Sequence, residues 1–278
     1  MDNNEKITLG GIGTNNGNNK PPYPGVPMDD EFKVPTEDII LPSRGAFYEN
    51  GKSTVTIKYL TAEEDNILFS EDLIRSGKVL EVLLEQAIID KDLRPDDMIS
   101  GDRNYLFIEI RKTGFGNEYK PGEISCESCK QIFNPVVDLG KLKPKFLEVM
   151  PDEDGYYSLE LPVTKMNIRF RLLRGSDEKR LAKTSESGKK KNAGARTSRL
   201  ITERYLLQIM EVNGKKDKLY ISKFISAMPT KDSLFFREYN RQIEPGIHLA
   251  YEFECDNCGH IETKDVPINH HLFYPDID

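Results

Sequence analysis

Four cysteines are the residues whose spacing most clearly predicts chemistry in this chain. They form two Cys-x-x-Cys pairs, Cys126 with Cys129 and Cys255 with Cys258. A tight turn between two such cysteines can point both thiolates at one ion. Tetrahedral zinc needs four ligands, so two facing pairs complete its coordination and leave no open position for substrate or water. We therefore predict one structural zinc ion per chain, bound by all four cysteines.

Other uses of the cysteines stay open at this point. The two pairs could be independent redox pairs, although neither follows a strand and opens a helix in the manner of thioredoxin. The four thiols could also remain without metal. Separate metal sites could be completed by histidines near the end of the chain, namely His260, His270 or His271.

No second constellation in the sequence predicts catalysis. The glycines in Gly10-Gly-Ile-Gly13 have no strand before them and no helix after them, which argues against a dinucleotide-binding turn. The four histidines all lie near the C-terminal end and accompany no nucleophile elbow or zinc-protease helix. We predict that the protein is not an enzyme and has no small-molecule substrate.

Composition narrows the class of protein further. The 278 residues are 37% hydrophobic and carry a net charge of -7, which suits a soluble globular protein and disfavours non-specific nucleic-acid binding. No apolar run is long enough for a membrane span, and the N-terminal residues do not resemble a signal peptide. We expect the protein in the cytoplasm of its maker, where thiols stay reduced.

The elements around each cysteine pair follow the same order. A strand at 55–59, helices from Thr61 and at 79–89, and a helix at 101–111 capped by Asp102 precede the first pair. A strand at 166–173 and helices at about 198–212, 218–228 and 231–243, the last opening with Asp232, precede the second pair. The aspartates lie 24 and 23 positions before the first cysteine of their pair.

This repetition predicts an α+β fold with an internal duplication. Each unit contains a strand, helices and a Cys-x-x-Cys hairpin, and a zinc-ribbon-like site joins the two units. We place the first repeat at 39–140, a linker at 141–165 and the second repeat at 166–278. The units should be related by an approximate two-fold axis through the metal, and a loop at about 185–197 should interrupt the second one.

The N-terminal residues 1–38 are predicted to form an extended arm. Gly, Asn and Pro dominate it, and its apolar residues are too few to form a core. Spaced apolar side chains in such a background suit a segment that lodges them in successive pockets of a partner. The candidate contacts are Ile7, Leu9, Ile12, Tyr23, Val26 and Phe32, and the alternative is a disordered, solubilising tail.

Several motifs, taken in order, resemble a known family. They are Leu41-Pro-Ser-Arg-Gly-Ala-Phe-Tyr48, Leu60-Thr-Ala-Glu-Glu-Asp-Asn-Ile-Leu68, Gly101-Asp-Arg-Asn104, the two cysteine pairs, and Leu272-Phe-Tyr-Pro275. They look like the baseplate hub and hub-assembly proteins of T-even-type contractile-tailed bacteriophages. The first pair departs from the pattern by having Lys130 where glycine is commoner, which puts the tightness of its turn in doubt.

The resemblance implies a non-enzymatic virion or assembly component. It would be made in the infected bacterial cytoplasm, act at the tail baseplate and bind other hub and tail proteins, with no membrane involved. Partner contacts are then also expected at Leu41, Pro42, Arg44, Phe47 and Tyr48. The rival interpretation is a zinc-ribbon adaptor for nucleic acid in replication or transcription, which would use Lys189, Lys190, Lys191, Arg196 and Arg199.

Overall fold

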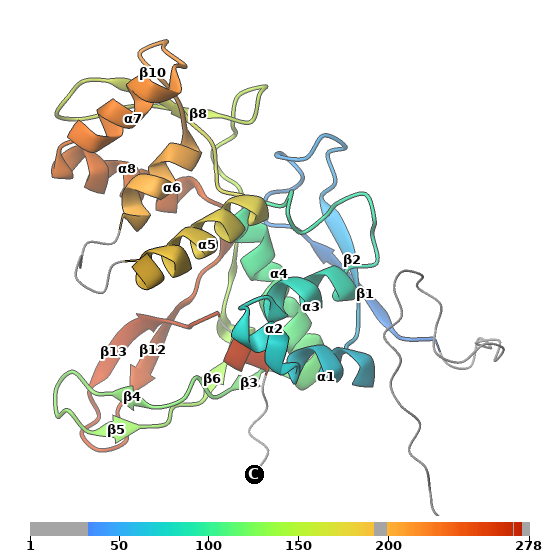
Figure 1. The fold of residues 1–278 in the computed structure, drawn as a ribbon. Coiled ribbons are helices and arrows are strands. Elements are labelled where there is room, and N and C mark those ends of the chain that lie inside the picture. Colours follow the sequence, from blue (N-terminus) through green and yellow to red (C-terminus); the bar gives the residue numbers. More distant parts are fainter. Residues whose placement is uncertain (1–32, 192–198, 269, 274–278) are drawn as a thin grey trace, which may run out of the picture. The chain divides into compact units, whose positions relative to one another are not determined.

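The computed structural model describes residues 33–191, 199–268 and 270–273, and the side chains of all of these except 185–191 and His270. Residues from Val34 onward form one compact unit. Eight α-helices and several small antiparallel sheets make up the described part of this unit, so the prediction of a mixed fold of helices and strands is confirmed (Figure 1). The six candidate contacts of the arm, from Ile7 to Phe32, lie outside the described residues.

The first half begins with two paired strands followed by four helices. Strand β1 (Thr36–Ile40) runs antiparallel to β2 (Thr54–Lys58), and β1 thus begins inside the range predicted for the arm. Helix α1 (Ala62–Leu68) starts with a capping box between Thr61 and Glu64, which satisfies two backbone amides at its N-terminus. The remaining helices are α2 (Glu71–Arg75), α3 (Val79–Ala87) and α4 (Ser100–Phe115).

The turn between β1 and β2 is held by Asp102 in the first turn of α4. The backbone amide of Ser43 donates to Asp102 Oδ1 at 3.0 Å, and the Tyr48 hydroxyl donates to Oδ2 at 2.6 Å. Asp102 is therefore a buried acceptor for a distant turn, whereas the sequence had suggested a helix cap. Burial raises the pKa of Asp102, and these hydrogen bonds to the carboxylate act in the opposite direction.

A corresponding contact occurs in the second half. Strand β8 (Tyr157–Glu160) pairs with β9 (Asn167–Phe170), and the turn between them places the amides of Val163 and Thr164 on the buried Asp232 carboxylate at 2.7 and 3.0 Å. Asp232 lies in the first turn of α8 (Thr230–Ile243), as Asp102 does in α4. The predicted linker therefore contributes a strand to the sheet.

The remaining elements of the second half are largely helical. Strand β10 (Ile209–Val212) completes a three-stranded sheet in the order β10-β9-β8. The predicted helix at about 198–212 ends earlier, since β10 follows it directly. The predicted loop at 185–197 is helical as far as Lys191. The other helices are α5 (Gly175–Lys191), α6 (Leu200–Gln208) and α7 (Lys218–Ala227).

Short hairpins carry the two cysteine pairs. The first half has β3 (Glu118–Tyr119) paired with β6 (Val137–Asp138), and β4 (Ile124–Ser125) paired with β5 (Ile132–Phe133). Two 3-10 turns, η2 (Leu139–Lys141) and η3 (His270–Phe273), are also described. The second half has β11 (Gly246–Ile247) paired with β7 (Pro144–Lys145), and β12 (Ala250–Glu254) paired with β13 (Ile261–Asp265).

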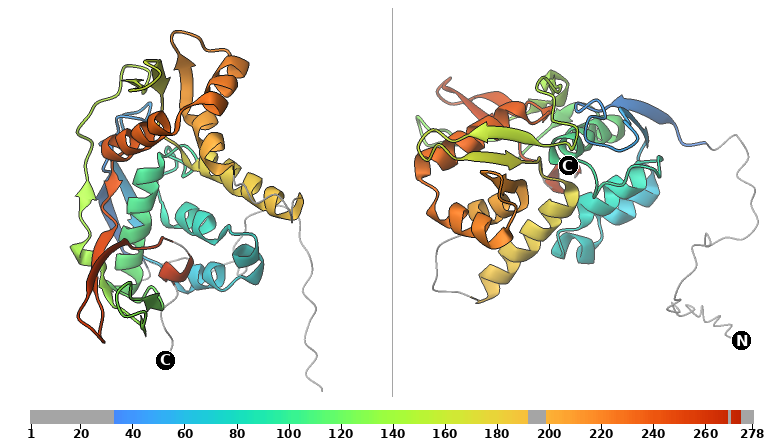
Figure 2. Two further views of the ribbon diagram at one scale, coloured as in Figure 1. Left: turned by 90° about the vertical axis from the view of Figure 1, so that its left-hand side faces the viewer. Right: turned by 90° about the horizontal axis from the view of Figure 1, so that it is seen from above.

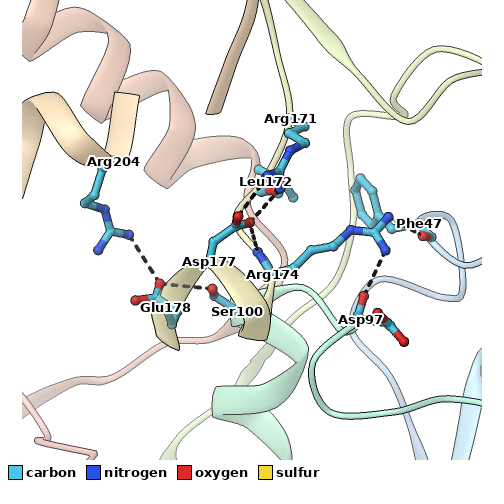
Figure 3. A network of polar contacts seen from close by, with 9 residues as sticks. All are labelled: Phe47, Asp97, Ser100, Arg171, Leu172, Arg174, Asp177, Glu178 and Arg204. Atoms are coloured by element: carbon cyan, nitrogen blue, oxygen red, sulfur yellow. Dashed lines mark hydrogen bonds and ion pairs between the residues drawn. The ribbon is translucent and has the colours of Figure 1, made fainter. Parts of the chain in front are cut away.

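The two halves share one core and a polar seam. The backbone amide of Ser100 at the start of α4 donates to the Leu173 carbonyl at 2.8 Å, beside a bridge between Ile99 and Arg174. Figure 3 shows the side chains there: Arg174 reaches the carbonyls of Asp97 and Phe47 at 3.0 and 3.1 Å. The seam therefore satisfies polar groups from both halves.

Candidate metal centre

The four cysteines form one cluster between the two hairpins. Their sulfur atoms all lie within 4.8 Å of one another. Two of these close pairs join opposite hairpins, because Cys126 Sγ lies 3.7 Å from Cys258 Sγ and Cys129 Sγ lies 3.7 Å from Cys255 Sγ. Ligands at about 2.3 Å from a tetrahedral zinc ion would be about 3.8 Å apart. The donor set and its spacing therefore fit zinc.

The two turns that present the sulfurs have the same hydrogen bonds. The amide of Cys126 donates to the Gln131 carbonyl at 2.9 Å, and the amide of Cys255 donates to the His260 carbonyl at 2.9 Å. The residue after each pair closes the turn, with Lys130 at φ 62° and Gly259 at φ 68°. Lys130 therefore takes the conformation that glycine takes in the second turn, and the first turn is equally tight.

The electrostatics of the cluster favour a cation. The pKa of the Cys129 thiol is lowered to about 6, because the Gln131 amide donates to its sulfur and the Asn257 side chain does so too, at 3.6 Å. The His260 amide lowers the pKa of Cys258, but loss of water around the sulfur and the other three thiols raise it to about 12. Four thiolates this close repel one another unless a metal ion neutralises them.

The geometry weighs against two of the alternative interpretations. Each sulfur lies close to one from the other hairpin, so the pairs do not form two separate redox centres. In the part of the chain that the structure describes, the metal-binding group contains the four cysteines and no histidine. A cluster of unmetallated thiols remains the alternative to metal.

The site ties together segments that are distant in the sequence. Cys129 and Cys255 lie 126 positions apart. Figures 1 and 2 show the β4–β5 and β12–β13 hairpins side by side at one end of the described fold, away from helices α6 and α7. An ion bound here would close a long loop of the chain and so restrict the unfolded state.

Comparison with known families gives a match that covers most of the described chain. The family model described as T4 bacteriophage base plate protein matches residues 41–273, which include both hairpins and both aspartate-held turns. The chain belongs to this family. The resemblance seen in the sequence is thereby confirmed. No curated protein and no solved structure matches the chain.

Membership in the baseplate family fits a structural protein of the virion tail. None of the described helices is both long and apolar enough to span a membrane. Among the residues suggested for nucleic-acid binding, Arg199 lies exposed just before α6. Arg196 and the side chains of Lys189, Lys190 and Lys191 lie outside the described part.

The segment at 41–48 plays a different part from the one expected. The side chains of Leu41, Pro42, Phe47 and Tyr48 are buried within this baseplate protein, Leu41 completely. They pack the turn that Asp102 holds, so partner contact by these four is not supported. Arg44 is exposed and lies over the Phe146 ring. Partner contact was expected because the segment is apolar, but apolar side chains are as typical of a protein core as of an interface.

Proposed function

We propose that the protein is a rigid structural or assembly component of the hub region of the tail baseplate, stabilised by one structural zinc ion. The cysteine cluster carries the proposal, because it joins two distant hairpins by ligands that leave no position for a substrate. Partners would be other tail proteins, contacted by the arm and by the surfaces of the two halves. Such a protein would be assembled in the host cytoplasm and would not be an enzyme.

The same proposal includes an internal duplication. Each half has a turn between two paired strands that donates two hydrogen bonds to an aspartate in the first turn of a helix, and that helix leads to a cysteine hairpin. We propose that the repeats begin at β1 and at β8, earlier than the sequence suggested. Asp102→Ala and Asp232→Ala each strand two hydrogen-bond donors, so each should cost about 2–4 kcal/mol in urea unfolding. A large cost at one site alone would contradict equivalent roles.

Metal content tests the zinc part of the proposal. We expect one zinc per full-length chain purified without chelator, measured by elemental analysis. The Cys255→Ser variant should lose most of the zinc and melt at a lower temperature, because three thiolates leave the coordination open. Ser128 lies between the first two cysteines, and Ser128→Ala is the matched control, which should keep the parent's zinc content and melting temperature. Two metals, none, or an unchanged melting temperature in Cys255→Ser would contradict a structural zinc.

Location tests the baseplate part. Mass spectrometry of purified virions and of tail-assembly intermediates from infected cells should find the protein in at least one of them. The nucleic-acid alternative instead predicts DNA binding whose affinity falls steeply with salt concentration. Absence from both virions and intermediates, together with such binding, would favour the adaptor function.

A further inference from the structure

The β12–β13 hairpin has one face that the described chain leaves uncovered. Alternate residues of a strand point to opposite faces of its sheet. One set, which includes Phe253 and Cys255, is buried or half-buried. The opposite set is exposed throughout, and it consists of Ala250, Glu252, Glu254, Ile261, Thr263 and Asp265. We call this second set the outer face.

An isoleucine lies among carboxylates on the outer face. Ile261 is 57% exposed, and the strand register places Glu254 directly opposite it. Glu252 is the diagonal neighbour, within reach across the two strands. Neither glutamate forms an ion pair with another described residue. A single exposed isoleucine is ordinary, but Ile132 occupies the same place in the other hairpin, three residues after the last cysteine, and is 62% exposed.

Charge determines what kind of partner this face suits. Residues 250–265 contain five acidic residues and one lysine. Four thiolates around a divalent ion would add two further negative charges beneath the same hairpin. A basic protein surface is attracted to such a face, whereas nucleic-acid phosphates are repelled by it. The β4–β5 hairpin differs, because Ser125 lies opposite Ile132 and residues 124–133 contain one acidic residue and one lysine.

We propose that the outer face binds a Lys/Arg-rich segment of a neighbouring tail protein, which also offers an apolar pocket for Ile261. This rests on the proposed baseplate function and specifies one partner surface within it. The hairpin is already held in place by its buried face and by the cysteine cluster. Binding therefore costs less conformational entropy than it would for a flexible loop, and more of the contact free energy contributes to affinity. Ile261 supplies the apolar anchor, and Glu252 and Glu254 select the basic partner.

Site-specific photocrosslinking in infected cells tests the proposal in the full-length chain. Benzoylphenylalanine replaces Ile261 or, as a matched position, Ile132, and mass spectrometry identifies the cross-linked peptides. Position 261 should cross-link to a tail-protein segment with an excess of Lys and Arg. Glu252→Lys combined with Glu254→Lys should lower that yield about tenfold. Glu118→Lys combined with Glu123→Lys makes the same change of charge in the chain just before the β4–β5 hairpin and should leave the yield from position 261 unchanged.

Each other outcome overturns the proposal. Cross-links from position 261 to an acidic or uncharged segment, to a second copy of this chain, or in a yield that charge reversal does not alter would contradict it. If position 132 cross-links to tail proteins and position 261 does not, the outer face is not an interface, while the baseplate function stands. If the protein is absent from both tail intermediates and virions, the baseplate function fails and this proposal fails with it.

Discussion

Lys130 and Gly259 close equivalent turns around the cysteines, and both have a left-handed backbone. That conformation costs a residue with a Cβ about 1–2 kcal/mol, whereas glycine adopts it freely. The larger conformational entropy of glycine in the unfolded chain offsets about 0.4–1 kcal/mol of the gain. Lys130→Gly should therefore raise the free energy of unfolding by about 0.5–1 kcal/mol, measured by urea unfolding of the zinc-loaded protein.

The reciprocal change is the control for this turn. Gly259→Lys should lower stability by about the same amount, because it introduces the strain that Lys130 already bears. A destabilising Lys130→Gly would show that the Lys130 ammonium, which donates to the Glu127 carbonyl at 2.6 Å, contributes more than the backbone strain costs.

The ion pair between Arg171 and Asp177 gives the seam a pH dependence. Arg171 donates to both carboxylate oxygens at 2.6 and 2.9 Å, and the Arg174 amide adds a third bond (Figure 3). Burial raises the pKa of Asp177, but these donors lower it overall. A lowered pKa means that the stabilisation is present above the ordinary carboxyl pKa and is lost as pH falls through the pKa of the folded protein.

Asp177→Asn should therefore be costly near neutral pH. We expect a loss of about 2–4 kcal/mol at about pH 7, because the variant leaves Arg171 without its carboxylate. The difference from the parent should shrink progressively as pH falls below about 4, because the unfolded chain takes up its proton there while the folded carboxyl group, with its lowered pKa, takes it up only at still lower pH. Urea unfolding across this range measures the change. Asp154→Asn, an exposed partner of Arg169, is the control and should cost less than about 1 kcal/mol. A cost independent of pH would exclude the ion pair as its cause.

The sequence alone predicted the roles of residues that depend on neighbours close in the chain. The cysteine pairs could be recognised because two residues of separation set the turn. The carboxylate of Asp102, by contrast, accepts hydrogen bonds from residues 59 and 54 positions away. Nothing local distinguishes such an acceptor from a helix cap, so the sequence alone could not give its role.

At the scale of elements, α4 packs closely against β11. A Cβ added to Gly101 would lie 1.7 Å from the Pro245 carbonyl oxygen, which precedes β11, and 3.3 Å from the Gly246 Cα at the start of that strand. Gly101→Ala must therefore separate the helix from the strand, and we expect a loss of at least about 2 kcal/mol in urea unfolding.

Gly114 in the same helix provides the matched control. A Cβ there meets only the Leu60 side chain, at 3.0 Å, and that side chain can move. Alanine also favours the helix by about 1 kcal/mol relative to glycine. Gly114→Ala should leave the free energy of unfolding unchanged or raise it. If both variants lose the same amount of stability, the close approach of α4 to β11 is not the reason for the glycine at position 101.

The elements predicted best are those with sustained helical periodicity. The predicted helices at 218–228 and 231–243 agree closely with α7 and α8. Strands β8 and β10 were missed, because four residues show too little alternation and because their stability depends on pairing with β9. These two strands form because they pair with β9, and the local sequence pattern does not reveal that pairing.

At the scale of the whole molecule, the compact unit begins at Val34. The Pro35 carbonyl already accepts a hydrogen bond from Tyr59, and β1 pairs with β2 over its full length. Deletion of residues 1–33 should therefore leave the fold and the zinc content intact, as measured by circular dichroism and elemental analysis.

The same deletion should weaken incorporation into tail intermediates, because the arm carries isolated apolar residues that suit pockets on a partner. Quantitative mass spectrometry of those intermediates measures the effect. Changing Ile7, Leu9 and Ile12 to serine keeps the length of the arm and should reproduce part of the loss. Incorporation at the parent level in both variants would show that the arm only solubilises the protein. A truncated chain that no longer folds would instead show that the arm belongs to the core. The deletion leaves every described strand of the compact unit in place, so only the loss of packing or backbone pairing made by residues 1–33 could unfold it.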